Sequence, residues 1–274
     1  MLEQRSTIVL LSVIPCWLVC AVGHGQQLDE SEFATVELMV ERAVEYICAR
    51  QQVDGAFEAP IEAQPGITSL CVLALASAGN VPDEGPRGKR MSRGIRYMLA
   101  AQQDDGIFSS EPPTPPFAVR QTSHNAAYSH PITAFALAEM YGMTGAQLQV
   151  PSRMGIERAL SISLRQQRED KRRAADHGGW RYLYRRPEAY DSDLSATSWH
   201  LLFLRSAKNA GFDVPPAPIR DAVAYVKRCY KPSEEHFYYG TQHWRGWDSR
   251  AMSGAGILSL SLAGEHHSKM ARAA

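Results

Sequence analysis

The chain has 274 residues, and its 29 Lys and Arg residues balance 29 Asp and Glu residues to a formal net charge of zero. Hydrophobic residues make up 45% of the sequence and charged residues 21%. This composition is ordinary for a packed domain and excludes a disordered, collagen-like or multi-span membrane protein. The balanced charge lacks the basic excess of nucleic-acid-binding proteins, so we expect no nucleic-acid partner.

Residues 1–25 have the pattern of a signal peptide or an N-terminal anchor. An apolar run over residues 7–22 follows Arg5, and the small residues Ala21 and Gly23 suit a cleavage site. Glu3 offsets the charge of Arg5, so an uncleaved anchor remains an alternative. We expect an exported protein, periplasmic or secreted, with residues 26–33 as a linker and with association at a membrane surface left open.

Three cysteines follow this leader, namely Cys48, Cys71 and Cys229. An odd number cannot pair completely within one chain, and their spacing fits no zinc motif. We expect them to act as small buried hydrophobic residues, and the sequence predicts neither a metal nor a cofactor.

A repeated turn runs through the rest of the chain. Residues 46–57 (YICARQQVDGAF) return 51 positions later as residues 97–108 (YMLAAQQDDGIF). A third copy carries a charged insertion at residues 168–176 before Trp180, and a degraded fourth copy occupies residues 225–239. Such internal periodicity indicates one structural unit used several times.

Apolar, small-residue-rich segments alternate with these turns, at residues 68–78, 132–141, 195–210 and 253–263, and a Gly follows each one. The pattern predicts helices with glycine C-termini. A helix that is apolar all round should be enclosed, whereas an amphipathic one such as residues 36–50 packs one face. We therefore predict an all-α array of about four helical hairpins with inner and outer helices.

The Gln-Gln-x-Asp-Gly-x-Phe turn resembles the QW-type turn of squalene and oxidosqualene cyclases and related prenyltransferase-like α/α toroids. Residues 128–144 and 178–211 are also similar to bacterial prenyltransferase/squalene oxidase repeat proteins. The resemblance covers residues 34–264 and implies a partial or small α/α toroid, with residues 265–274 as a C-terminal tail. Toroids of this superfamily host cyclases, prenyltransferase subunits, thioester domains and carbohydrate-active proteins, so the fold alone does not give the activity.

The missing metal and thioester motifs argue against two of these activities. Prenyltransferase subunits bind zinc through an Asp-x-Cys pair and a later His, but this chain has Asp193 and Ala251 at those positions. Without the thiolate and the imidazole, a tetrahedral zinc site is not expected. The Cys-Gly-Glu-Gln thioester sequence is also missing.

The acid motif of class II cyclases, Asp-x-Asp-Asp-Thr-Ala, resembles residues 191–196, with Leu194 in place of the last acid. The resemblance makes Asp193 the proton donor and Asp191 its supporting carboxylate, because two neighbouring carboxyls can keep one protonated. His200 is a second candidate for support. The alternative is that Asp193 caps the following helix, which should lower its pKa.

Aromatic residues give a further argument, since 14 of the 24 Phe, Trp and Tyr residues lie after position 179. Ring faces stabilise cations without reacting with them. The alternative for aromatics at the repeated turns, Trp180 among them, is packing between hairpins. Our candidate substrate-binding residues are Trp180, Tyr182, Trp199, His200, Trp244 and Trp247.

We therefore expect a terpene-cyclase/prenyltransferase-like protein that acts on or binds an apolar isoprenoid-type ligand through protonation by Asp193. The alternative is a non-catalytic or carbohydrate-active secreted toroid that binds or cleaves polysaccharides. Candidate proton-transfer groups for that alternative include His124, Tyr128, His130, Arg181 and Asp248, although His124 also suits an exposed surface position. The sequence leaves open whether the protein is an enzyme and what its oligomeric state is.

Overall fold

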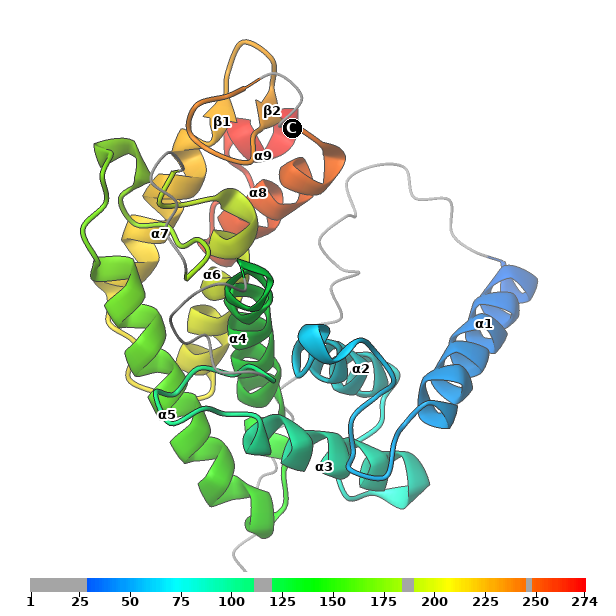
Figure 1. Ribbon diagram of the computed structural model, residues 1–274. Helices are drawn as coiled ribbons and strands as arrows, with labels where there is room; N and C mark the ends of the chain where they lie inside the picture. Colours follow the sequence, from blue (N-terminus) through cyan, green and yellow to red (C-terminus); the bar gives the residue numbers. More distant parts are fainter. Residues whose placement is uncertain (1–28, 111–119, 184–189, 245–247) are drawn as a thin grey trace, which may run out of the picture. The chain divides into compact units, whose positions relative to one another are not determined.

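The computed structural model describes residues 29–110, 120–183, 190–244 and 248–274 (Figure 1). The predicted leader lies outside these ranges. The chain divides into two compact units, Met1–Glu45 and Tyr46–Ala274. In the first unit, helix α1 (Glu30–Ala49) begins inside the expected linker, because the Asp29 carboxylate accepts hydrogen bonds from the backbone N–H groups of Ser31 and Glu32, both at 2.8 Å.

The second unit is helical, and the predicted all-α class is confirmed. Its helices are α2 (Gly66–Ser77), α3 (Gly85–Ala100), α4 (Arg120–Met140), α5 (Ala146–Arg168), α6 (Leu194–Asn209), α7 (Pro216–Arg228), α8 (Arg250–Leu262) and α9 (Lys269–Ala273). Short 3-10 helices lie at Ile61–Ala63, Tyr141–Met143 and Ala174–Asp176. Strands β1 (Tyr230–Lys231) and β2 (His236–Phe237) pair antiparallel, with Tyr230 opposite Phe237.

Helices α2, α4, α6 and α8 pack side by side in chain order, and α3, α5 and α7 pack against them (Figure 1). Helices α4 and α6 run in the same direction. The Tyr128 hydroxyl, near the middle of α4, donates to Ser195 at the start of α6 at 3.2 Å, and Ser206 donates to Glu139 near the ends of both helices. We call α2, α4, α6 and α8 the first layer, and α3, α5 and α7 the second layer.

Three of the repeated turns bind the next second-layer helix through the same hydrogen bonds. In each of these three turns a glutamine amide donates both to the carbonyl of the turn glycine and to a carbonyl of the next second-layer helix. These glutamines are Gln51, Gln102 and Gln167, with donor–acceptor distances of 2.7 to 3.0 Å. At the first turn Gly55 has φ +99°, and a Cβ there would lie 2.5 Å from the Arg93 carbonyl oxygen. The close approach of turn and helix therefore requires glycine.

The aromatic residue that follows each turn fills the core. Phe57, Phe108, Trp180 and Phe237 are all at most 2% exposed. The indole N–H of Trp180 donates to the Ser163 carbonyl at 2.8 Å, so its polar atom is satisfied inside the core. Packing between hairpins is therefore the role of these aromatics.

Several helix predictions need correction. Helix α4 begins at Arg120, twelve residues before the predicted start at residue 132, because its polar first half hides the helical pattern and Pro131 lies inside the helix. The expectation that apolar helices are enclosed is wrong for α2, where Leu70 is 36% exposed and Cys71 is half-buried. Cys48 and Cys229 are buried, as predicted.

At the end of the chain, residues 265–274 include α9, which packs against α8. Lys227 of α7 pairs with Glu265 at 2.7 Å. This end therefore continues the folded unit. Across the four described ranges, no helix is both long enough and apolar enough to cross a bilayer.

Candidate functional site

Asp193 begins helix α6 and is completely buried. Its Oδ1 accepts a hydrogen bond from the Ala196 backbone N–H at 2.7 Å, and its own backbone N–H donates to the Trp180 carbonyl at 2.9 Å. The capping hypothesis is therefore confirmed. The carboxyl group satisfies one of the free amides that every helix start exposes.

The expected fall in the pKa of Asp193 is wrong. Burial raises its pKa from 3.8 to about 6, because removal from water penalises the charged form. Arg181, the Ala196 N–H and the Tyr239 hydroxyl lower the pKa, but they offset only part of this effect. The geometry explains why, since Arg181 approaches the second carboxyl oxygen only to 3.8 Å. Asp193 thus combines a capping role with a raised proton affinity.

The Arg181 guanidinium lies among aromatic rings. Its Cζ atom is 4.8 Å from the ring centre of Tyr182, 5.1 Å from that of Tyr190 and 5.6 Å from that of Tyr239. Ring faces attract cations at such distances. The rings and Asp193 therefore both hold Arg181. Its positive charge lies beside the Asp193 carboxyl but does not form a close, bidentate pair with it.

Three phenol groups surround this pair. The Tyr182 and Tyr239 hydroxyls are 2.8 Å apart, and the Tyr128 hydroxyl donates to Ser195. Burial, followed by the charge of Asp193, raises the pKa values of Tyr128 and Tyr239. Tyr128 and Tyr239 consequently remain protonated and can donate hydrogen bonds.

His124 joins this cluster, with its ring 4.2 Å from that of Tyr182. The sequence placed His124 at the surface, but it is half-buried. We call Asp193, Arg181, Tyr128, Tyr182, Tyr239 and His124 the acid cluster.

Asp191 binds a different cation. Its carboxylate accepts hydrogen bonds from the Arg172 side chain, at 2.5 Å for the shortest, and from the Arg172 backbone N–H at 2.7 Å. The charge of Asp191 is thus balanced by Arg172. The groups that act on the Asp193 carboxyl are instead Arg181, the Ala196 N–H and the Tyr239 hydroxyl, and all three favour its charged form.

Trp180 and His200 lie inside the core. Their rings stack at 4.6 Å with 7° between the planes, and they are 1% and 2% exposed. Burial lowers the pKa of His200, so its imidazole is neutral. Neither residue exposes surface to a ligand in this conformation, and their contact with a ligand stays a prediction. His130 lies 6.0 Å from His200, and burial lowers its pKa to about 4.

Trp199 is half-buried on α6, and it lies on a partly exposed face shared with α4. Residues at spacings of four, three and four positions share one side of a helix. On α6 this side carries Ser195, Trp199, Leu202 and Ser206; on α4 it carries Tyr128, Phe135 and Glu139. The hydrogen bonds from Tyr128 to Ser195 and from Ser206 to Glu139 join the two sides. We call these residues the α4–α6 face, and its apolar centre is Phe135, Trp199 and Leu202, all half-buried.

Of the other predicted ligand contacts, Tyr182 belongs to the acid cluster. Trp244 is 50% exposed, and its ring meets that of Tyr190 edge-on at 5.2 Å. Trp247 lies outside the described residues.

The sequence did not predict two residues that lie near the acid cluster. Tyr190 packs beside Arg181, and Asp176, completely buried, accepts a hydrogen bond from the Asp191 backbone N–H at 3.1 Å. Asp176 belongs to the charged insertion at residues 168–176, and no sequence signal marks Tyr190.

A scan against protein-family models finds no match, and a search of curated proteins also finds none. Within the described ranges, no group of three or more His, Cys, Asp or Glu side chains is arranged to hold a metal ion. The chemistry that the described side chains offer is proton donation from a buried carboxyl beside an arginine and several phenols.

Proposed function

We propose that the second unit forms part of a squalene-cyclase-type α/α toroid, with the first layer as its inner helices. Two observations support this arrangement. Helices α4 and α6 of the first layer run in the same direction, and equivalent glutamines connect three of the four turns to a second-layer helix. The same proposal assigns residues 1–25 to an export leader or anchor.

On this scaffold, the protein binds an apolar isoprenoid-type ligand along the α4–α6 face. Phe135, Trp199 and Leu202 provide partly exposed apolar surface at the centre of the face. Tyr128 and Ser195 end the face two residues from Asp193 along α6. The ligand therefore lies with one end close to the acid cluster.

Asp193 acts as the proton donor to a carbon–carbon double bond of this ligand. The observation that carries the proposal is the complete burial of the carboxyl, which raises its pKa to about 6. A carboxyl that is partly protonated near neutral pH can donate its proton. The Asp193 carboxyl has no exposed surface, so proton transfer requires the surrounding tyrosine side chains to move apart. The O–H bond of Asp193 breaks as a C–H bond forms, and the ring faces of Tyr128 and Trp199 stabilise the positive charge on carbon. The adjacent carbon then loses a proton to the Asp193 carboxylate, which restores a double bond at a new position and regenerates the acid.

The test is incubation of the purified protein with squalene and with shorter isoprenoid alcohols in detergent micelles, followed by mass-spectrometric product analysis. Asp193→Asn should abolish product formation but leave ligand binding intact. Asp213→Asn is the matched control, because it makes the same change at an exposed position. If the wild-type protein gives no product and its tryptophan fluorescence is not quenched, isoprenoid binding and protonation are excluded.

A glycan ligand is the second candidate, and the position of Trp244 favours it. Half of this side chain is exposed, and its ring is steadied by Tyr190. Exposed aromatic rings beside Tyr, His and Arg side chains suit stacking on sugar rings and proton transfer. A glycan array separates the two functions, since retention of an oligosaccharide that is lost in Trp244→Ala would favour the carbohydrate function.

A further inference from the structure

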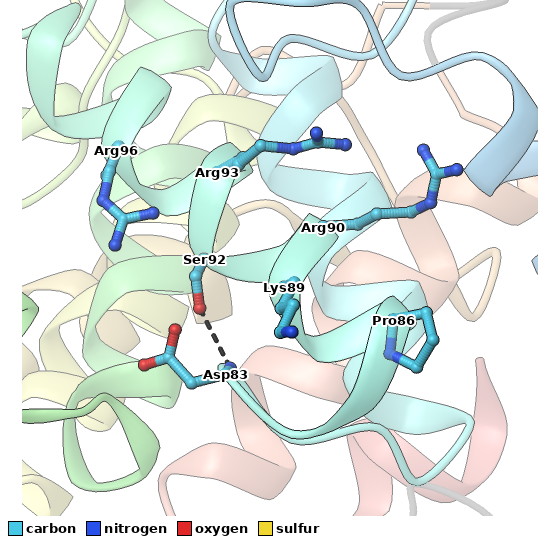
Figure 2. A pocket seen from close by; sticks show the side chains of 7 residues that line it. All are labelled: Asp83, Pro86, Lys89, Arg90, Ser92, Arg93 and Arg96. Atoms are coloured by element: carbon cyan, nitrogen blue, oxygen red, sulfur yellow. Dashed lines mark hydrogen bonds between the residues drawn. The ribbon is translucent and has the colours of Figure 1, made fainter.

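A basic depression of about 510 Å³ lies on helix α3, in the second layer. Its lining consists of Asp83, Pro86, Lys89, Arg90, Ser92, Arg93 and Arg96 (Figure 2). Four cationic side chains against one carboxylate leave a net lining charge of three positive. This concentration is local, because the whole chain has zero net charge.

The sequence of α3 carries five basic residues and no acidic one. Lys89, Arg93 and Arg96 follow one another at spacings of four and three positions, which places them on one side of the helix. Like charges at these spacings destabilise a helix by a few tenths of a kcal/mol per pair. The stability of the fold therefore does not account for this cluster.

Several basic residues of the neighbouring second-layer helices have protein partners. On α5, Arg153 pairs with Glu157 at 3.0 Å and Arg158 donates to the Gln103 and Asp104 carbonyls. On α7, Lys227 pairs with Glu265. The described side chains provide no carboxylate within ion-pair distance of Lys89, Arg90 or Arg96, and Arg93 donates only to the neutral Gln51 amide, at 2.6 Å.

The loop before α3 closes one end of the depression. The Asp83 backbone N–H donates to the Ser92 hydroxyl at 3.0 Å, which fixes the loop against the helix (Figure 2). Arg90 and Arg93 extend in the same direction in this view (Figure 2). Guanidinium groups of this kind bind phosphate oxygens in pairs.

We propose that this depression binds an anion with two or more linked phosphate groups. One phosphate group carries a charge of about −1.5 to −2 near pH 7, so a single group would leave part of the lining charge unbalanced. Residues 89 to 96 also span about 10 Å of helix axis, at 1.5 Å per residue. An extended, multiply charged anion therefore matches the site better than one phosphate. A soluble diphosphate and a phospholipid headgroup both offer phosphate oxygens, and the test separates these two sources.

The experiment measures binding of inorganic pyrophosphate to the full chain by calorimetry, at low salt and at about 0.15 M salt. The test variant is the double substitution Lys89→Gln and Arg96→Gln, which avoids the Arg93 contact with Gln51. The matched control is Arg165→Gln and Arg220→Gln, which removes two exposed charges from α5 and α7. Thermal unfolding of both variants verifies that each one folds.

We expect pyrophosphate to bind at least tenfold more tightly than orthophosphate, and more weakly at the higher salt concentration. The test variant should lose at least tenfold in affinity without losing stability, whereas the control should keep its affinity. Equal losses of affinity in both variants would show a nonspecific effect of net charge and overturn the proposal. The proposal also fails if the wild-type protein binds neither pyrophosphate nor the vesicles described next.

A second arm uses vesicles of phosphatidylcholine with and without phosphatidic acid. Sedimentation with the acidic vesicles alone, lost in the test variant and displaced by pyrophosphate, would assign the site to a phospholipid headgroup. Pyrophosphate binding without sedimentation would assign it to a soluble ligand. Either result is independent of isoprenoid binding at the α4–α6 face, so the two proposals can fail separately.

Discussion

In both α2 and α6, the backbone N–H of the buried turn aromatic donates to a threonine hydroxyl, that of Thr68 or Thr197. The residue four positions before this threonine differs, Gln64 before α2 and Asp193 before α6. Each residue lies beside the buried aromatic of its turn. Gln64 donates its amide N–H to the Phe57 carbonyl at 2.6 Å, and the Asp193 backbone N–H donates to the Trp180 carbonyl at 2.9 Å. Both side chains are buried, at 3% and 0% exposure.

The difference between Gln64 and Asp193 shows that the fold does not need an ionisable side chain at this position. The amide of Gln64 is neutral, and its oxygen also accepts a hydrogen bond from the Thr68 hydroxyl at 2.8 Å. Pro65 occupies the cap position of α2 without a side-chain hydrogen bond, so a first-layer helix can begin without an ionisable cap. The carboxyl of Asp193 adds an ionisable group whose burial opposes its charge. This cost indicates a function for the acid beyond capping.

The largest expected effect on stability concerns the buried turn aromatic that both helix starts have. Phe57→Ala and Trp180→Ala should each reduce the free energy of unfolding by about 3 to 5 kcal/mol, because each removes a completely buried aromatic ring. Urea denaturation monitored by circular dichroism measures both. A loss below about 1 kcal/mol in either variant would contradict a structural role for that turn aromatic.

The next prediction tests the feature in which the two helix starts differ, the ionisable carboxyl of Asp193. The pKa of Asp193 is higher in the folded protein than its unfolded value of 3.8, so the folded state binds more protons between about pH 4 and pH 6. The contribution of this group to stability is therefore fully present below pH 4 and is lost as the pH rises through about 6. At pH 8, Asp193→Asn should be more stable than the wild type by up to roughly 3 kcal/mol, at 1.36 kcal/mol per pKa unit.

The measurement is urea denaturation of both proteins from pH 4 to pH 8. Gln64→Glu provides the opposite change, since it introduces a carboxyl into the neutral site, and it should destabilise the protein most at high pH. If the stabilities of wild type and Asp193→Asn keep a constant difference over this range, Asp193 does not titrate there.

A smaller effect should follow from Arg181→Gln. Arg181 lowers the pKa of Asp193, so its removal should raise that pKa further above 6 and extend the pH-dependent loss of stability to higher pH. Arg172→Gln is the matched control, because Arg172 pairs with Asp191. A shift of equal size in the control would contradict a specific effect of Arg181 on Asp193.

The smallest predicted effect is that of Tyr182→Phe, which removes the hydroxyl that lies 2.8 Å from the Tyr239 hydroxyl. We expect a loss of about 1 kcal/mol in the free energy of unfolding, the usual contribution of one hydrogen bond. Isoprenoid binding should be unchanged, whereas a glycan that relies on this hydroxyl should bind more weakly. Fluorescence titration and the glycan array measure these two outcomes.

The sequence predicted the positions of most first-layer helices, because their apolar segments and terminal glycines are local signals. Residues 195–210 were expected to be helical, and α6 spans Leu194–Asn209. The start of α4 was missed because its first half is polar and Pro131 suggested a helix boundary.

The acid cluster could be predicted only in part. Asp193 stands in a recognisable motif, but its partners come from separate segments, namely Tyr128 on α4 and Tyr239 after β2. The pairing of Asp191 with Arg172 likewise joins positions 19 residues apart. Local sequence patterns do not specify such contacts, because they depend on how the helices pack. For the same reason, capping predicted a lower pKa for Asp193, whereas its complete burial raises that pKa.

The most direct test of the account is the titration of Asp193 itself. Carbon-13 NMR of the side-chain carboxyl, assigned by comparison with Asp193→Asn, measures its pKa in the folded protein. We predict a midpoint near pH 6 for this carboxyl. A midpoint at or below the ordinary value of 3.8 would show a carboxylate that is charged throughout the neutral range, and it would contradict a role for Asp193 as proton donor.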